Sequence, residues 1–223
     1  GVKHYSSMDL VGRVLLGRHP EIDSQFMKED AERLEALTQL LKKYPLSEPG
    51  LFRSLSEKIG GQSLYLGNSL PIREWDMAAS WQSVPARVVA NRGANGIDGQ
   101  VSSFLGWVRE TEDNWAIVGD LTALYDLDSL WITPQLDPAL KARIVVINNF
   151  GGKIFERMFN SKLFLNQHQL QFDHWAKMFH WDYQMWEGIP SDMNLSQRVI
   201  IELRPNLEQS AQFWSEYQQL WSL

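Results

Sequence analysis

The chain of 223 residues is long enough for one large α/β domain, or for one domain with a small appendage, and 44% of its residues are hydrophobic, enough for a substantial core. Its net charge of −6 leaves no basic stripe for a phosphate backbone, so we expect no nucleic-acid partner. The absence of cysteine excludes disulfides, thiolate zinc sites and cysteine nucleophiles.

The sequence carries no signal for a membrane. No apolar run approaches the roughly 18 residues that span a bilayer, and no basic stretch followed by an apolar block opens the chain. We therefore expect a soluble, cytoplasmic protein without a membrane partner. Because residues 1–3 lack an initiator methionine and lead directly into a strand-like stretch, we also expect a fragment of a longer protein.

Two amphipathic helices are expected in the first 60 residues. Between residues 24 and 44 the apolar residues at helical spacing are Met27, Ala31, Leu34 and Leu41. A break at 45–49 then supplies Ser47 as a helix cap, and a second helix runs to the glycines at 60 and 61. We place a domain boundary in this break, between an N-terminal extension or domain remnant at 1–46 and the main domain at 47–223.

After the break, short apolar runs alternate with polar loops and helix-like segments. The runs lie at 63–66, 87–90, 115–118, 143–147 and 198–203. Such alternation favours an α/β fold with a mostly parallel sheet flanked by helices on both faces. Ligands bind such sheets at the carboxyl ends of the strands. Glycine- and asparagine-rich loops follow four of the runs, at 67–69, 91–96, 119–120 and 148–152.

The last third of the chain offers weaker signals. A terminal helix is expected at 206–223, with one apolar face made of Leu207, Ala211, Trp214 and Trp221. The three histidines at 168, 174 and 180 recur every six residues. Because this spacing does not stack on a helical face, we expect surface or core histidines and no zinc site.

The most specific signal is a pair of loops at strand ends. Gly119-Asp120 closes one run, and Asn148-Asn149 closes the next after a helix-length crossover. This order places a carboxylate and an amide oxygen side by side, which suits a hard cation such as Mg²⁺. The glycines at 151 and 152 allow a backbone carbonyl to join the ligands and offer amides to phosphate oxygens. Either dipeptide alone is more often an ordinary turn.

This Gly-Asp start and Asn-Asn end resemble the cofactor motif of thiamine diphosphate enzymes. The resemblance implies thiamine diphosphate and Mg²⁺, or Mn²⁺, as cofactors, with Asp120, Asn149 and the carbonyl of Gly151 as metal ligands. The residues that it places around thiamine diphosphate are Ile97, Leu121, Thr122, Ala123, Gly151, Gly152 and Ile154. Ile97 stands where the family holds the cofactor in its bent conformation, although a buried packing isoleucine explains it equally well.

Three longer segments resemble one family within this group. Segments 67–73, 91–99 and 119–127 are similar to signatures of the synthases that make 2-succinyl-5-enolpyruvyl-6-hydroxy-3-cyclohexene-1-carboxylate (SEPHCHC) in menaquinone biosynthesis. The resemblance runs from about Ser47 to the end, and implies the carboxyl-terminal domain that binds the cofactor diphosphate. Enzymes of this family decarboxylate 2-oxoglutarate and add the succinyl carbanion to isochorismate.

The implied substrates carry several carboxylates, which an acidic protein binds through arginines. Arg73 and Arg92 lie in two of the signature loops, and Ser69 adds a hydroxyl group. Phe155 and Met158 would wall the substrate pocket. Each has an ordinary explanation, as a surface charge, a turn former or the apolar face of a helix. Two departures from the family are Phe150, in place of a small or polar residue, and Lys153, in place of glycine or glutamine.

The family also implies a partner. Its cofactor-activating glutamate lies on an amino-terminal pyrimidine-binding domain, usually of a partner subunit, so we expect a homodimer or homotetramer. We predict that this piece alone contains no catalytic residue and is inactive. Two alternatives stay open: another thiamine diphosphate-dependent decarboxylase or lyase, and a non-catalytic α/β binding module whose motif has decayed. The two arginines favour the synthase over the first alternative, and cofactor binding would exclude the second.

Overall fold

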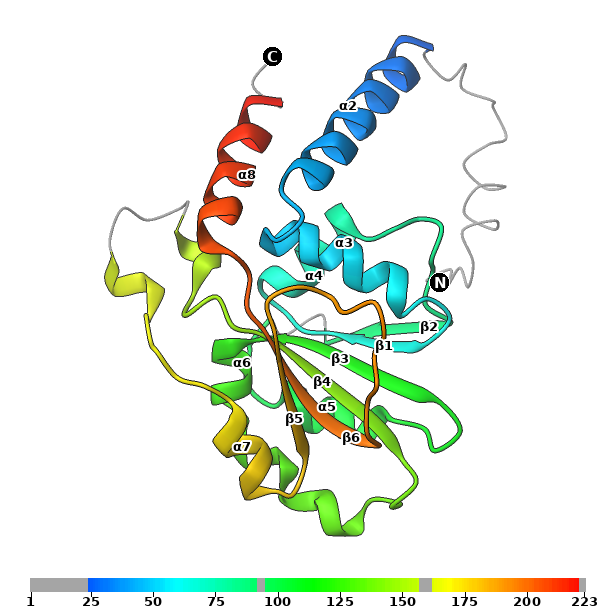
Figure 1. Cartoon of the computed structure of the whole chain (residues 1–223), viewed down its shortest axis with the longest axis vertical. Coiled ribbons are helices and arrows are strands. Elements are labelled where there is room, and N and C mark those ends of the chain that lie inside the picture. Colours follow the sequence, from blue (N-terminus) through cyan, green and yellow to red (C-terminus); the bar gives the residue numbers. More distant parts are fainter. Residues whose placement is uncertain (1–23, 92–94, 157–161, 221–223) are drawn as a thin grey trace, which may run out of the picture.

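The computed structural model describes residues 24–91, 95–156 and 162–220, and a six-stranded sheet lies at its centre (Figure 1). The strands are β1 (Ser63–Leu66), β2 (Arg87–Ala90), β3 (Asp113–Gly119), β4 (Lys141–Ile147), β5 (Asp182–Trp186) and β6 (Arg198–Leu203). They are ordered β2-β1-β3-β4-β6-β5, and all neighbouring pairs are parallel. The expected α/β fold with a parallel sheet is confirmed.

Helices cover both faces of the sheet. The α-helices are α2 (Ser24–Lys43), α3 (Glu48–Lys58), α4 (Leu70–Ala78), α5 (Gln100–Trp107), α6 (Asp120–Leu124), α7 (Asp173–Met178) and α8 (Leu207–Leu220), and the 3-10 helices are η1 (Leu127–Gln135), η2 (Lys153–Phe155) and η3 (Lys162–Leu165). Helices α2, α3, α4 and α8 pack on one face, and α5, α6 and α7 pack on the other. Within the described residues no helix combines the length and apolar character that crossing a bilayer requires.

The central strands are apolar on both sides, which explains the uninterrupted apolar runs in the sequence. In β4, Val145 and Ile147 belong to the core beneath α3 and α8, whereas Ile144 and Val146 belong to the core beneath α5 and α7. Successive side chains of a strand point to opposite faces, so a strand between two helical layers is buried on both. The sheet therefore separates two hydrophobic cores.

The strand β5 was missed by the sequence analysis. It lies at the edge of the sheet and pairs only with β6, and of its five residues only Trp186 is buried. An edge strand with one covered side chain needs no apolar run, so neither hydrophobic periodicity nor composition marked it.

The expected faces of the two terminal helices were partly wrong. In α2 the buried residues are Leu37, Leu40 and Leu41, near its end, while Met27 and Leu34 are exposed. In α8 the only buried residue is Phe213, and Leu207 is 45% exposed. Only one end of α2 reaches the body of the protein, as Figure 1 shows.

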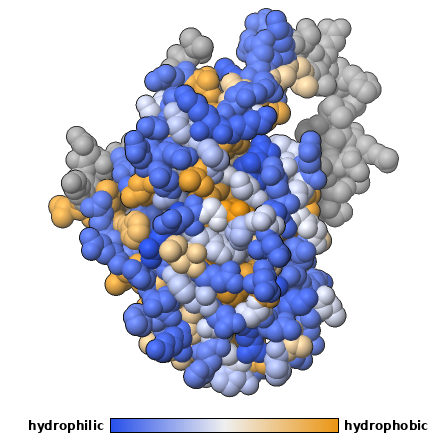
Figure 2. Space-filling model, viewed as in Figure 1, coloured by the Kyte–Doolittle hydropathy of each residue, from blue (hydrophilic) through white to orange (hydrophobic). Residues whose placement is uncertain are grey.

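Apolar surface gathers over η3 and below α8 in Figure 2, where Leu163, Phe164 and Leu207 are exposed.

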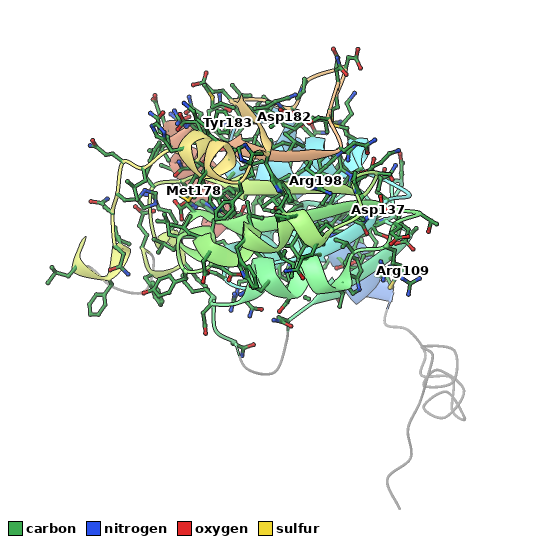
Figure 3. The ribbon with its side chains drawn as sticks, turned by 90° about the horizontal axis from the view of Figure 1, so that it is seen from below. Arg109, Asp137, Met178, Asp182, Tyr183 and Arg198 are labelled. Atoms are coloured by element: carbon green, nitrogen blue, oxygen red, sulfur yellow. The ribbon has the colours of Figure 1, made fainter. Side chains whose placement is uncertain are left out.

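The amino ends of the strands are closed by ion pairs and hydrogen bonds. Figure 3 looks onto this edge, where Arg198 begins β6 and Asp182 begins β5. The guanidinium of Arg198 donates to the carbonyls of Thr133, Leu136 and Asp137, at 2.7 to 3.3 Å. These bonds join η1 to the start of β6.

The carboxyl ends of the strands are open at one point of the sheet. From β1 the chain passes to β2 on one side of it, and then returns to form β3 on the other side. The loops that follow β1 and β3 therefore run in opposite directions, which leaves a crevice between them. This switch point is where a parallel sheet of this kind binds its ligand.

A buried carboxylate supports the strand ends beside this crevice. Glu202 on β6 is fully buried, and it accepts hydrogen bonds from Asn148 Nδ2 at 2.8 Å, Phe172 N at 2.9 Å and Tyr183 Oη at 2.8 Å. Arg204 adds an ion pair at 2.6 Å. Burial alone would raise the pKa of Glu202, but these hydrogen bonds outweigh it and lower that pKa. Glu202 thus joins the loop after β4 to β5 and to α7.

We expect Glu202→Ala to destabilise the protein by about 3 kcal/mol or more, because it leaves Arg204 and three hydrogen-bond donors without their acceptor. Urea unfolding followed by circular dichroism measures this change. The matched control is Glu208→Ala on α8, an exposed position that should shift the free energy of unfolding by no more than about 0.5 kcal/mol. Equal values for the two variants would contradict the supporting role of Glu202.

Candidate functional site

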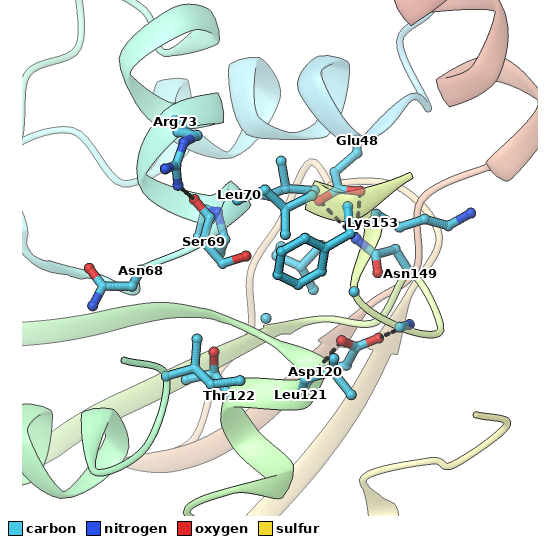
Figure 4. A pocket seen from close by; sticks show the side chains of 18 of the residues that line it. Glu48, Asn68, Ser69, Leu70, Arg73, Asp120, Leu121, Thr122, Asn149 and Lys153 are labelled. Carbon is cyan, nitrogen blue, oxygen red and sulfur yellow. Dashed lines mark hydrogen bonds between the residues drawn. The ribbon is translucent and has the colours of Figure 1, made fainter. Parts of the chain in front are cut away.

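A cavity of about 320 Å³ lies at the switch point of the sheet (Figure 4). All four loops expected from the sequence contribute to its lining. The residues expected at a site that do line it are Ser69, Arg73, Ile97, Asp120, Leu121, Thr122, Asn149, Gly151, Gly152, Ile154 and Phe155. Ala123 does not, because it is buried in the core beneath α5. Arg92 and Met158 lie outside the described residues.

Asp120 joins the ends of β3 and β4. It is the first residue of α6, its side chain is buried, and its Oδ1 accepts a hydrogen bond from Leu121 N at 2.6 Å. Its Oδ2 accepts one from Gly151 N at 2.9 Å. Burial raises the pKa of Asp120, and the two amides and His168 act in the opposite direction. A buried carboxylate of this kind gains from a nearby cation.

His168 faces the same carboxylate and was not recognised in the sequence as part of the site. Its Nε2 lies 3.1 Å from Asp120 Oδ2, and its Nδ1 accepts a hydrogen bond from Leu170 N at 3.1 Å. Because Nδ1 is an acceptor, the proton of a neutral ring would be on Nε2, the nitrogen nearer Asp120. This contact forms because the chain turns back toward Asp120 after η3. The six-residue spacing of the histidines does not predict that turn.

Asn149 presents a buried side-chain oxygen that has no partner among the described residues. Its Nδ2 donates to both oxygens of Glu48, at 3.1 and 2.9 Å. Its Oδ1 is buried and accepts no hydrogen bond from the part of the chain that the structure describes. In Figure 4, Asn149 lies between Glu48 and Asp120. An unsatisfied buried acceptor beside a buried carboxylate fits a bound hard cation.

A cation at this place would depend on amide and backbone oxygens. Among residues 24–91, 95–156 and 162–220, no group of three or more His, Cys, Asp or Glu side chains is arranged to hold a metal ion. Of the three expected ligands, which are Asp120, Asn149 and a backbone carbonyl, only Asp120 is a side chain of these four types. Mg²⁺ commonly takes one or two carboxylates and completes its shell with phosphates and water.

The backbone at Gly151 permits no other residue. Its φ is +143°, and a Cβ at this position would lie 2.4 Å from the carbonyl oxygen of Leu165. The preceding residue, Phe150, also has a positive φ of 66°. These two residues turn the chain so that the amide of Gly151 reaches Asp120. Phe150 therefore occupies a strained turn, because the Cβ of a residue with positive φ crowds the backbone.

The loops after β1 and β2 are held together by Gln100. Its Oε1 accepts a hydrogen bond from Asn68 N at 2.8 Å, and its Nε2 donates to Gly96 O at 2.7 Å. Gln100 is fully buried. The loop bearing Ser69 is thereby fixed against the loop that leads to Ile97.

Basic side chains lie at the mouth of the cavity. Arg73 is exposed, and its Nη1 donates to the carbonyl of Ser69 at 2.5 Å, while Ser69 has a positive φ of 73°. Lys153 also lines the cavity and pairs with Glu156 at 2.7 Å. An anionic ligand would thus meet a guanidinium and an ammonium group at the entrance.

Glu48 was also missed by the sequence analysis as a residue of the site. It is in the first turn of α3, after the expected cap Ser47, whose Oγ accepts from Gly50 N at 3.1 Å. An acidic residue at this position is the rule in helices, so nothing in the sequence set Glu48 apart. Burial, and then the charge of Asp120, raise the pKa of Glu48 to about 7.

We expect Gly151→Ala to lower the free energy of unfolding by about 3 kcal/mol or more, since the added methyl group meets backbone at a φ that L-residues avoid. The control is Gly106→Ala in α5, where a Cβ would meet nothing within 4 Å. That change should stabilise by about 0.5 to 1 kcal/mol. Thermal unfolding of both variants tests this, and a stable Gly151→Ala protein would contradict the described turn.

Without divalent cations, we expect the protein to be less stable at pH 7.5 than at pH 5. The pKa of Glu48 is higher in the folded chain, about 7 against 4.5, so the folded state binds the proton more tightly. The stabilisation is complete below pH 4.5 and is lost as the pH rises through 7. At most it amounts to about 3 kcal/mol.

The control for this pH dependence is Glu48→Gln, which cannot titrate. Urea unfolding at the two pH values, in the presence of a chelator, gives the difference for each protein. The difference should be larger in the unsubstituted chain than in Glu48→Gln. An equal pH dependence would show that Glu48 titrates normally.

The sequence is similar to known synthases over almost its whole length. It is 53% identical to the 2-succinyl-5-enolpyruvyl-6-hydroxy-3-cyclohexene-1-carboxylate synthase of Bdellovibrio bacteriovorus, over 99% of this chain and 42% of that protein. Proteins of the same name from Akkermansia muciniphila and Oceanobacillus iheyensis are 45% and 32% identical, over 56% and 85% of this chain and 24% and 36% of their own lengths.

The chain spans less than half the length of these curated relatives. No protein-family model matches the sequence. The similarity to the Bdellovibrio protein nevertheless covers the whole sheet and all loops of the cavity. The chain therefore belongs to the 2-succinyl-5-enolpyruvyl-6-hydroxy-3-cyclohexene-1-carboxylate synthase family.

Proposed function

We propose that this chain is the carboxyl-terminal, cofactor-binding part of an SEPHCHC synthase that uses thiamine diphosphate and Mg²⁺. The observation that carries the proposal is the pairing of two buried ligands at neighbouring strand ends. Asp120 and Asn149 line one cavity, the amide of Gly151 joins the first to the loop of the second, and Asn149 Oδ1 has no partner in the described chain. The names of the relatives support the same reaction.

In this proposal Asp120, Asn149 and the carbonyl of Gly151 hold Mg²⁺, or Mn²⁺ in its place. The Gly151 carbonyl accepts a hydrogen bond from Lys153 N at 2.9 Å and keeps a second lone pair for the metal. When bound, thiamine diphosphate supplies the electron sink for the decarboxylation. The cofactor would be in contact with Ile97, Leu121, Thr122, Gly152 and Ile154.

The proposed substrates are 2-oxoglutarate and isochorismate. Arg73, at the mouth of the cavity, would bind a carboxylate, and Ser69 beside it would add a hydroxyl group. Phe155 would form part of the apolar wall. We assign Arg92 and Met158 to the same pocket from the sequence alone. The two arginines would offset the net charge of −6 where dianionic substrates enter.

Catalysis in this proposal needs a further domain. The cavity contains no glutamate that the family motif assigns to cofactor activation, and we expect that group on an amino-terminal pyrimidine-binding domain of a partner subunit. The working protein would then be a cytoplasmic homodimer or homotetramer. The chain alone should bind the cofactor but consume no 2-oxoglutarate.

We expect thiamine diphosphate to change the tryptophan fluorescence of this chain only when Mg²⁺ or Mn²⁺ is present. Asp120→Ala should weaken this binding by on the order of 100-fold, since even residues that merely orient metal ligands contribute about 10- to 100-fold. Titration with thiamine diphosphate, with and without metal, gives both affinities.

Asp128→Ala is the matched control, because Asp128 is exposed in η1 and lies outside the cavity. Binding that ignores the metal would contradict the roles of Asp120 and Asn149.

For the reaction itself, the longer protein that contains this chain should consume 2-oxoglutarate in the presence of isochorismate. Full activity of its Arg92→Ala variant would remove the substrate assignment.

A further inference from the structure

We propose that Glu48 is a positioning residue, which turns the carboxamide of Asn149 so that its oxygen faces the cation site. The inference rests on the proposed metal site and adds to it a residue outside the cofactor motif. Glu48 lies more than 70 residues before Asp120 in the sequence, on α3, and α3 supplies none of the loops that follow the strands.

The chemistry of the contact determines the direction of the amide. Both oxygens of Glu48 lie within 3.1 Å of Asn149 Nδ2, and a carboxyl oxygen accepts hydrogen bonds from an –NH₂ group. The –NH₂ end of Asn149 must therefore face Glu48, and Oδ1 must face away from it. A carboxamide is nearly symmetric in shape, so without such a partner it can turn and present N–H donors to a cation.

The position of Glu48 is itself fixed on several sides. Its backbone N donates to Ser210 Oγ of α8 at 2.9 Å, and Ser47 caps the helix. A Cβ at Gly50 would lie 2.3 Å from the carbonyl oxygen of Tyr44, so the chain is closely packed at this turn. The amino end of a helix also favours a negative charge in its first turn. Glu48 is only 4% exposed, so its side chain is held within the protein.

Glu48 is placed to orient a ligand and not to be one. In Figure 4 it lies on the far side of Asn149 from Asp120, and both of its oxygens are engaged by Asn149. Residues that hold metal ligands in this way typically contribute about 10- to 100-fold to metal affinity.

A double-mutant cycle on Mn²⁺ binding tests the inference. Binding of Mn²⁺ to the chain saturated with thiamine diphosphate is measured by electron paramagnetic resonance of the free ion. Glu48→Ala and Asn149→Ala should each weaken Mn²⁺ by about 10-fold or more, and Glu48→Ala should add less than about 2-fold when Asn149 is already replaced. A residue that acts only through Asn149 has nothing left to orient in that background.

Two variants separate orientation from charge and from folding. Glu48→Gln keeps an oxygen that accepts from Asn149, so it should retain Mn²⁺ affinity within about 3-fold, well inside the effect expected of Glu48→Ala. Glu57→Ala, an exposed glutamate on the same helix, should change nothing. If Glu48→Ala does not fold by circular dichroism, Glu48→Leu keeps the volume, removes the acceptors and takes its place in the cycle.

Each outcome decides the inference. Unchanged affinity in Glu48→Ala would overturn it, and so would a loss in Glu48→Gln as large as in Glu48→Ala, which would indicate an effect of charge alone. An equal loss with and without Asn149 would make Glu48 a ligand and not a positioning residue. If the unsubstituted chain bound no Mn²⁺, the proposed metal site would fail first, and the role of Glu48 with it.

Discussion

The hydrogen bond from Gly151 N to Asp120 Oδ2 holds the site together, because it joins the ends of two neighbouring strands across the sheet. It requires a turn at Phe150 and Gly151 that only glycine can complete, as the positive φ and the nearby Leu165 carbonyl show. Without this bond the buried carboxylate of Asp120 would keep only Leu121 N and His168 as partners. The turn at Phe150 and Gly151 is therefore fixed by this one acceptor.

Polar groups beneath this loop extend the same arrangement into the core. Glu202 on β6 accepts a hydrogen bond from the side chain of Asn148, and Glu48 on α3 accepts one from the side chain of Asn149. Two adjacent asparagines are thus held by two buried carboxylates from opposite directions. Buried polar networks of this kind favour a single geometry, and a missing partner in them is costly.

Sequence analysis gave the parallel sheet and most of the cavity, since both follow from local patterns. Apolar runs mark the central strands, and the loops that contain Asp120 and Asn149 follow directly from them. It missed β5, which is polar and at the edge, and it missed Glu48 and His168. These two residues reach the site through long-range packing, and long-range packing leaves no periodic trace in the chain.

Arg73, near the carboxyl ends of the strands, differs from the arginines at their amino ends. At the amino ends Arg87, Arg143 and Arg198 are all engaged, with Glu112, with Asp113 and with three carbonyls, respectively. At the carboxyl ends the guanidinium of Arg73 is exposed at the cavity mouth. Substitutions that change ligand recognition at the carboxyl ends therefore leave the ion pairs and hydrogen bonds at the amino ends intact. Ligand preference can change in this way without loss of stability.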